Sequence, residues 1–191
     1  RESIYWGRDR LSGAHRWIHD LLYPRQSPDE FEGHIEHSPL FWGDLYREKV
    51  RYVRNFTFSE INTLKACPMM PYHDPDRPFV QSWFAGTEGP CVTTFTDMLR
   101  EENQDRLAAE GGASIVYTHF SQGFVEQNRV QPEFERLMRR LSRLNGWFVP
   151  AHTLLDFLAT KRQGQSLAVA DRSRVERRWL LQKMFKTRGR S

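Results

Sequence analysis

Histidine offers the most chemistry in this sequence, and the position of His119 among the seven histidines is the most informative. It lies near the end of the run 113–120 (ASIVYTHF), whose apolar, β-branched and aromatic residues are typical of a buried strand. In parallel α/β folds, catalytic groups gather at the carboxyl ends of strands. The sequence therefore predicts that His119 lies where catalytic groups and ligands gather. The alternative is a partly buried histidine that is hydrogen-bonded to a neighbouring loop.

A second histidine pattern has the spacing of a metal site. His15 and His19 are four residues apart in His-Arg-Trp-Ile-His, which places both imidazoles on one face of a helix. We expect them to bind a divalent metal, with zinc favoured; the alternative is two ordinary positions on an amphipathic helix. His34 and His37 form a rival pair with a spacing of three residues, in a segment that is expected to be a loop.

Aromatic side chains form a third group of candidates. Trp42, Trp83 and Tyr72 can stack on sugar rings, because one face of a pyranose is apolar and matches an aromatic ring. The alternative is that they pack in the core, as most such residues do. Trp42 and Trp83 are flanked by glycine and turn residues, which favours them as residues that line a site.

The elements that must position these residues differ between the two halves of the chain. The first 90 residues are rich in turn signals, with a helix running into a strand over 45–56 and a capping box at 57–60 that starts a short helix. The rest alternates regularly. It predicts helices from Thr93 or Thr94 to Gly111-Gly112, from Pro132 to Asn145-Gly146 and over 154–158, with strands at 113–120 and 147–149. This alternation implies a parallel sheet, hence an α/β layer or barrel.

The order and spacing of residues 111–160 resemble the last βαβα segment of the polysaccharide deacetylase superfamily. The matching features are the strand that ends in His119, the following helix, Gly-Trp-Phe-Val-Pro at 146–150 and the closing helix from Thr153. The resemblance implies a partial (β/α) barrel over 1–165 with an irregular, aromatic-rich front half, followed by a basic helix or tail over 166–191.

The resemblance also implies roles for individual residues. His119 would be the general acid, and His15 and His19 would match the metal-binding His-x-x-x-His motif. Tyr72 would match the Arg-x-Pro-Tyr segment, in which Met69 stands here in place of arginine. Asp74 resembles the acidic residue that precedes a tryptophan in the family. The segment Asp-Pro-Asp-Arg-Pro at 74–78 also predicts a rigid turn.

The activity that the resemblance implies is the metal-dependent hydrolysis of N- or O-acetyl groups on a polysaccharide or glycan precursor. The sequence has no Thr-Phe-Asp-Asp motif, which would supply the base and the first metal ligand. We therefore expect either the carboxyl-terminal part of a longer enzyme, favoured by the absence of an initial methionine, or a degenerate member without catalysis. The runner-up function is a non-catalytic scaffold in surface-glycan assembly, with a basic tail that faces a membrane.

Charge is distributed unevenly in the chain. The net charge is +4, but eight basic and two acidic residues give 171–191 a charge of +6 and leave −2 for the rest. The tail predicts a basic amphipathic helix that contacts an anionic membrane surface or docks Trp179 and Leu180 on the body. No nucleic-acid-binding motif accompanies it, so nucleic acid is not an expected partner.

Other features exclude whole classes of protein. Two cysteines exclude a disulfide-rich scaffold and a cysteine-type zinc ribbon, and no apolar run reaches the ~18 residues of a membrane span. The first residues lack the pattern of a signal peptide, which favours the cytoplasm if Arg1 lies near the true start.

Overall fold

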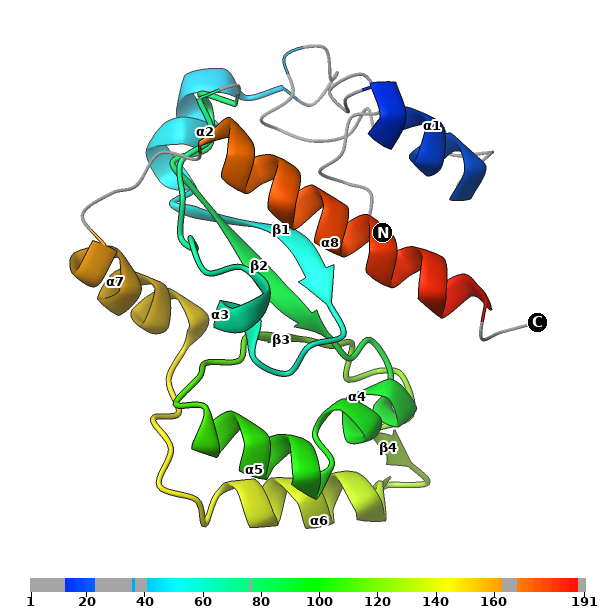
Figure 1. The fold of residues 1–191 in the computed structure, drawn as a ribbon. Coiled ribbons are helices and arrows are strands. Elements are labelled where there is room, and N and C mark those ends of the chain that lie inside the picture. The colour runs from blue at the N-terminus through cyan, green and yellow to red at the C-terminus, as the bar shows by residue number, and fades with distance from the viewer. Residues whose placement is uncertain (1–12, 23–35, 37–40, 76, 163–167, 189–191) are drawn as a thin grey trace. The chain divides into compact units, whose positions relative to one another are not determined.

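The computed structural model describes residues 13–22, 36, 41–75, 77–162 and 168–188 (Figure 1). It is mixed α/β and divides into two compact units. Unit 1 comprises residues 1–56, 69–84 and 158–191, and unit 2 comprises residues 57–68 and 85–157. No helix within the described ranges is both long enough and apolar enough to cross a membrane.

A small sheet contains β1 (Tyr52–Phe58), β2 (Ser82–Glu88) and β3 (Val116–Tyr117) in the order β1-β2-β3. β2 and β3 are parallel, with Thr87 opposite Val116 and Glu88 opposite Tyr117. The arrows of β1 and β2 also run in the same direction in Figure 1. The predicted parallel α/β arrangement is therefore confirmed, while the described strands form no closed barrel.

The helices of unit 2 bury one shared apolar core. They are α4 (Val92–Met98), α5 (Glu101–Ala109) and α6 (Pro132–Leu141), and the short helix α3 (Thr63–Ala66) precedes them in the chain. α6 begins with Pro132 at its first turn, as the sequence predicted. Residues of α5 and α6 pack against five buried side chains at the centre of this core. The five are Ile61, Phe95, Met98, Leu99 and Phe124.

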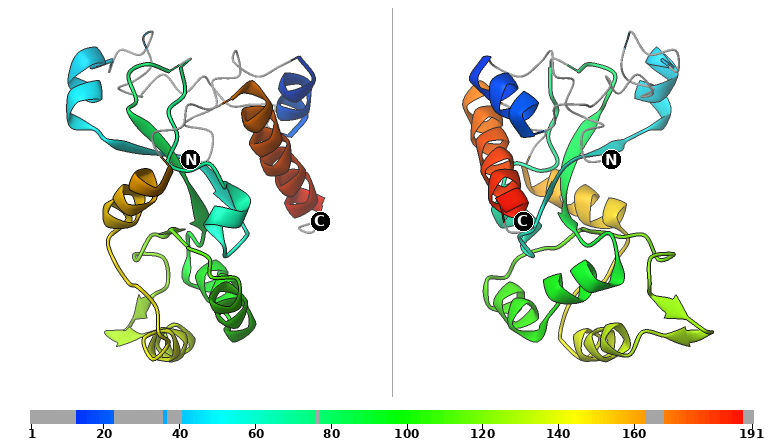
Figure 2. Two further views of the ribbon diagram at one scale, coloured as in Figure 1. Left: turned by 60° about the vertical axis from the view of Figure 1, so that its left-hand side comes forward. Right: turned by 90° about the vertical axis from the view of Figure 1, so that its right-hand side faces the viewer.

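A hairpin that the sequence did not predict precedes α6. β4 (Val125–Glu126) and β5 (Arg129–Val130) are antiparallel, and Gln127 and Asn128 between them both have positive φ. Two consecutive left-handed residues are typical of a type I′ turn, which matches the twist of a two-stranded hairpin. The hairpin projects beside α6 in both views of Figure 2.

Three sequence predictions about unit 2 are wrong in detail. Thr57 does not cap a helix but lies in β1, and the cap of α3 is Asn62, whose side chain accepts a hydrogen bond from the Lys65 amide. The single helix predicted up to Gly111 is divided into α4 and α5 at Leu99 and Arg100, although Gly111 has the expected positive φ of 57°. Residues 147–149 form no strand, because the described chain contains no neighbour that pairs with them.

Unit 1 holds α1 (Gly13–Leu22), α2 (Gly43–Lys49) and α8 (Val169–Arg188), while α7 (Ala151–Arg162) starts in unit 2 and ends in unit 1. The helix-to-strand passage predicted for 45–56 is confirmed by α2 and β1. α8 buries Val175, Trp179 and Leu180, and the Trp179 ring lies 6.2 Å from the ring of Phe56. The basic tail is thus a helix whose apolar residues pack against unit 1.

Candidate functional site

The chain leaves β2 and β3 side by side at their carboxyl ends, in unit 2. The amide of Gly89 donates to the carbonyl of Tyr117 at 3.1 Å, and the amide of His119 donates to the carbonyl of Pro90 at 3.1 Å. A third hydrogen bond, from the Val92 amide to the Gln122 carbonyl at 3.0 Å, continues this pairing beyond the strands. His119 therefore lies on a segment whose backbone is fixed, at the strand end where the sequence predicted it.

The His119 imidazole is exposed and held by one specific contact. Its Nε2 atom is hydrogen-bonded to the hydroxyl of Tyr117, and the two rings meet edge to face at 4.8 Å between centroids. The phenol restricts rotation of the imidazole while the ring still faces solvent. An exposed, oriented imidazole has the geometry that proton transfer to a bound ligand needs.

Glu88 and Thr57 extend this group on the neighbouring strands. Glu88 is opposite Tyr117 in the parallel ladder, so their side chains point to the same face of the sheet. The Thr57 hydroxyl donates to Glu88 Oε1 at 3.3 Å, and Glu88 is only 5% exposed. Thr57, Glu88, Tyr117 and His119 are called the strand-end cluster below. It brings together a carboxyl group, a phenol and an imidazole, three groups that transfer protons or bind polar ligands.

The segment after β2 also carries a thiol with altered acidity. Cys91 forms a capping box with Thr94 at the start of α4, and its Sγ atom lies 3.3 Å from Thr94 Oγ1. The hydrogen bond from the Thr94 side chain lowers the pKa of the Cys91 thiol, and a backbone hydrogen bond from Thr94 acts in the same direction. Cys91 directly follows Pro90, whose carbonyl accepts the hydrogen bond from the His119 amide.

An exposed aromatic ring follows His119 in the chain. Phe120 is 65% exposed, yet its ring is supported by edge-to-face contacts at 5.1 Å with the buried Phe124 and at 6.5 Å with Phe134. These contacts hold Phe120 in one place while part of the ring remains open to solvent. Phe120 therefore offers an exposed aromatic ring at the position that follows His119 in the chain.

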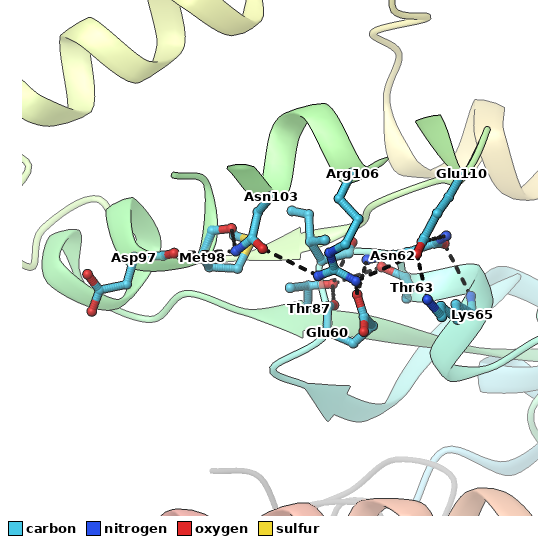
Figure 3. Close-up of polar contacts among 11 residues, drawn as sticks. Glu60, Asn62, Thr63, Lys65, Thr87, Asp97, Met98, Asn103, Arg106 and Glu110 are labelled. Carbon is cyan, nitrogen blue, oxygen red and sulfur yellow. Dashed lines mark hydrogen bonds and ion pairs between the residues drawn. The ribbon is translucent and has the colours of Figure 1, made fainter. Parts of the chain in front are cut away.

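A polar network next to the strand-end cluster fixes the strands that carry it (Figure 3). The hydroxyls of Thr63 and Thr87 lie 2.9 Å apart, and Thr87 also donates to the Glu60 carbonyl at 2.8 Å. Thr63 further accepts from the amide of Ile115, just before β3, at 3.0 Å. One threonine from the α3 segment thus contacts both β2 and the approach to β3, which stabilises their register.

The outer part of the network in Figure 3 consists of charged residues. Arg106 donates to Glu60 at 2.7 Å, and Glu110 accepts from Asn62 at 2.8 Å and from Lys65 at 2.5 Å. The hydrogen bond with Lys65, followed by the one with Asn62, lowers the pKa of Glu110. These contacts connect α5 to the α3 segment, so they have a structural role.

The aromatic and acidic residues predicted to bind substrate lie in unit 1. Tyr72 and Trp83 are buried and pair through two backbone hydrogen bonds, of 3.0 and 2.7 Å. Asp74 is also buried and forms an ion pair with Arg77. The Arg77 amide donates to the Asp74 carbonyl at 2.9 Å, as expected of the turn that was the alternative reading. Of this predicted set only Trp42, which is 63% exposed and precedes α2, offers a ring to solvent.

The predicted metal pair falls on α1. His15 and His19 both lie in this helix, but their side chains are outside the described part of the structure. The residues that are described contain no group of three or more histidine, cysteine, aspartate or glutamate side chains able to hold a metal ion. The described residues therefore do not provide the metal site that the family resemblance implies.

Sequence reasoning found His119 but missed the residues around it. Glu88 stands just before Gly89-Pro90, which ends a strand, and this position was a usable signal. Tyr117 lies two residues before His119, and the alternation of a strand places both side chains on the same face.

Comparison with known proteins identifies no relative of this chain. No protein-family model, no curated protein and no solved structure matches it.

Proposed function

We propose that this chain takes part in the hydrolysis of acetyl groups on a polysaccharide or glycan precursor, with His119 as the proton donor to the leaving group. The observation that carries the proposal is the exposed His119 imidazole, held by Tyr117 at the carboxyl end of a strand in a parallel sheet. The order of elements around it, resembling the polysaccharide deacetylase superfamily, supports acetyl hydrolysis over other reactions that use a histidine. In this proposal, β1–β3 belong to a (β/α) barrel of that type.

The chemistry assigned to His119 is a single proton transfer. Water adds to the acetyl carbonyl carbon and loses a proton to solvent. The tetrahedral intermediate then collapses by breaking the bond from carbon to the sugar nitrogen or oxygen. The departing atom needs a proton, which the His119 imidazolium supplies as the bond breaks. Acetate and the free amine or alcohol are the products, and the exposed imidazole regains a proton from solvent.

Two neighbours of His119 have supporting roles in the proposal. The Tyr117 hydroxyl fixes the ring of His119, so that the other imidazole nitrogen is directed to the ligand. Phe120 provides the apolar surface on which one face of a sugar ring rests. The divalent metal of the family, with zinc favoured, would supply a more acidic bound water, but no step is assigned to it because the described residues do not form its site.

The test is acetate release from N-acetylated and O-acetylated oligosaccharides by the full-length protein that contains this chain, with zinc or another divalent metal added. His119→Ala should lower the rate by ~10²–10⁴-fold, the usual contribution of a general acid. Tyr117→Phe should retain more activity, because it removes only the contact that orients the ring. His152→Ala is the matched control, since His152 is also an exposed histidine of unit 2.

Two results would contradict the proposal. The first is a wild-type rate in the His119→Ala variant, which would show that another group protonates the leaving atom. The second is the absence of acetate release by the wild-type protein with every substrate and metal tested.

A further inference from the structure

A hollow of about 480 Å³ lies on unit 2, against α5 and α6. This volume is within the range of ~300–1,000 Å³ that is usual for small-molecule pockets. Four guanidinium groups and one carboxylate line it, together with one apolar side chain: Glu101, Arg136, Arg139, Arg140, Arg143 and Leu144. The lining is therefore strongly basic, although residues 1–170 as a whole carry a net charge of −2.

Two of the four arginines are fixed by acidic neighbours. Arg136 donates to both carboxylate oxygens of Glu133 at 2.8 Å and also contacts Glu101. Arg140 contacts Asp105 at 2.6 Å and Glu101 at 3.0 Å. The Arg136 hydrogen bond is the main reason that the pKa of Glu101 is lowered. Arg136 and Arg140 are thus held in place around the Glu101 carboxylate.

The other two arginines are available to a ligand. Among the described residues, the Arg139 guanidinium pairs with Glu135 alone, one turn earlier on the exposed face of α6, at 2.6 Å. Exposed pairs of this kind contribute ~0.3–0.5 kcal/mol, so an anion can displace them easily. The Arg143 guanidinium has no hydrogen bond or ion pair to any residue that the structure describes. Arg139 and Arg143 are four positions apart, and both line the hollow.

The ordinary explanation of such arginines is a solvated helix face. α6 does present a polar outer face, because Leu137 is buried and Phe134, Met138 and Leu141 pack on the unit 2 core. That explanation accounts for Arg136 and Arg140, which are matched by carboxylates. It does not account for the hollow that Arg139 and Arg143 share.

We infer that this hollow binds a small ligand that bears a phosphate group. Guanidinium groups bind phosphate oxygens through paired hydrogen bonds, and Arg139 and Arg143 together provide two such groups. Glu101 already pairs with Arg136 and Arg140, so the phosphate binds to Arg139 and Arg143. Leu144 offers an apolar contact to the organic part of the ligand.

The test is calorimetric titration of the chain with inorganic pyrophosphate at low salt. We expect saturable binding by the wild-type protein and at least ~10-fold weaker binding by Arg139→Gln/Arg143→Gln. Arg143→Gln alone should weaken binding by a smaller factor. The control is Arg129→Gln/Arg177→Gln, which removes two exposed arginines outside the hollow and should leave the affinity unchanged.

Three outcomes would overturn the inference. They are no detectable binding of pyrophosphate by the wild-type protein, unchanged affinity in Arg139→Gln/Arg143→Gln, and equal loss of affinity in the control variant. The last would indicate a general effect of positive charge. Circular dichroism melting distinguishes unfolding from lost binding. Both target arginines are exposed, so their replacement should leave the fold intact. The experiment needs no acetylated substrate, so its result is separate from the test of His119.

Discussion

Units 1 and 2 use their polar residues in opposite ways. In unit 1, polar side chains with possible chemical roles are buried and bind one another: Asp74 pairs with Arg77, and the Asn55 amide donates to the Tyr72 hydroxyl at 2.5 Å. In unit 2, His119 and the arginines of α6 remain on the surface. A residue type that suggests chemistry in the sequence therefore has a structural role in one unit and is available for function in the other.

The difference has a physical origin in the local sequence. Unit 1 contains the turn-rich segment 69–84, in which short connections leave many backbone and side-chain polar groups away from solvent. Such groups must form hydrogen bonds internally, because an unsatisfied buried polar group costs ~1–3 kcal/mol. Unit 2 has regular helices and a compact apolar core, which satisfy their own backbone groups. Polar side chains such as Thr63 and Thr87 are buried and hydrogen-bonded here too, but His119 and the arginines of α6 lie at a strand end and on a helix face.

The largest expected effect is on the buried ion pair of unit 1. The side chains of Asp74 and Arg77 are 2% and 9% exposed, and Arg172 lies 3.7 Å from Asp74 on another side. Asp74→Asn should lower the free energy of unfolding by ~3–5 kcal/mol, because it removes the negative charge of a buried ion pair. Urea unfolding followed by circular dichroism measures this loss.

The matched variant for this prediction is Glu133→Gln in unit 2. Glu133 also pairs with an arginine, Arg136, but both side chains are about half exposed. Its urea midpoint should stay within experimental error of wild type, because solvent and salt screen such a pair. Equal losses in the two variants would refute the contrast between the units.

The parts of the fold that could be predicted from sequence are those decided by local signals. Pro132 at the first turn of α6 and Gly111 after α5 marked the ends of helices correctly, because each requires a particular backbone angle. His119 was placed at a strand end by the apolar run before it. A parallel sheet was expected from the alternation of helices and strands, but the parallel partner of β3 is β2, which the sequence did not predict, and not residues 147–149.

The errors arose where distant residues decide the structure. Thr57 has the sequence of a helix cap, but pairing in the sheet keeps it in β1. Trp147 and Phe148 have the composition of a strand, but the described chain offers them no partner. Tyr72, Asp74 and Trp83 resembled site residues, and their burial depends on contacts that no local pattern reports. Only part of the strand-end cluster could be predicted for the same reason. Glu88 lies opposite Tyr117 because of the register between their strands, which no local pattern reports.

An intermediate effect is expected at Gly112, in the polar network of unit 2. A Cβ atom there would lie 2.2 Å from the side-chain nitrogen of Asn62, which caps α3 and binds Glu110. Gly112→Ala should therefore lower the free energy of unfolding by ~1–3 kcal/mol through overpacking. The measurement is again urea unfolding.

The double variant Asn62→Ala/Gly112→Ala separates the clash from other effects of alanine. Asn62→Ala alone removes the cap, at a cost of ~1 kcal/mol. If the clash is the cause, adding Gly112→Ala to it should produce little further loss. A fully additive loss would instead indicate that contact with the Asn62 side chain is not the cause, and would weaken the claim that this network fixes unit 2.

The smallest expected effect is the acid dependence contributed by Glu110, which is a surface group in contrast to Asp74. Lys65, and then Asn62, lower the pKa of Glu110 in the folded protein below the ordinary value of about 4.3. Its contribution to stability is therefore present above pH ~4.3 and is lost as the pH falls through the folded pKa. In Glu110→Gln, the side chain at position 110 does not titrate. The urea midpoint of this variant should therefore decrease slightly less than that of wild type between pH 5 and pH 3. Lys65→Met should give a similar change, because it removes the largest cause of the shift. Identical acid dependence in all three proteins would show that this exposed pair of unit 2 contributes nothing to stability. Of the pairs compared, only the buried pair of unit 1 would then stabilise the fold.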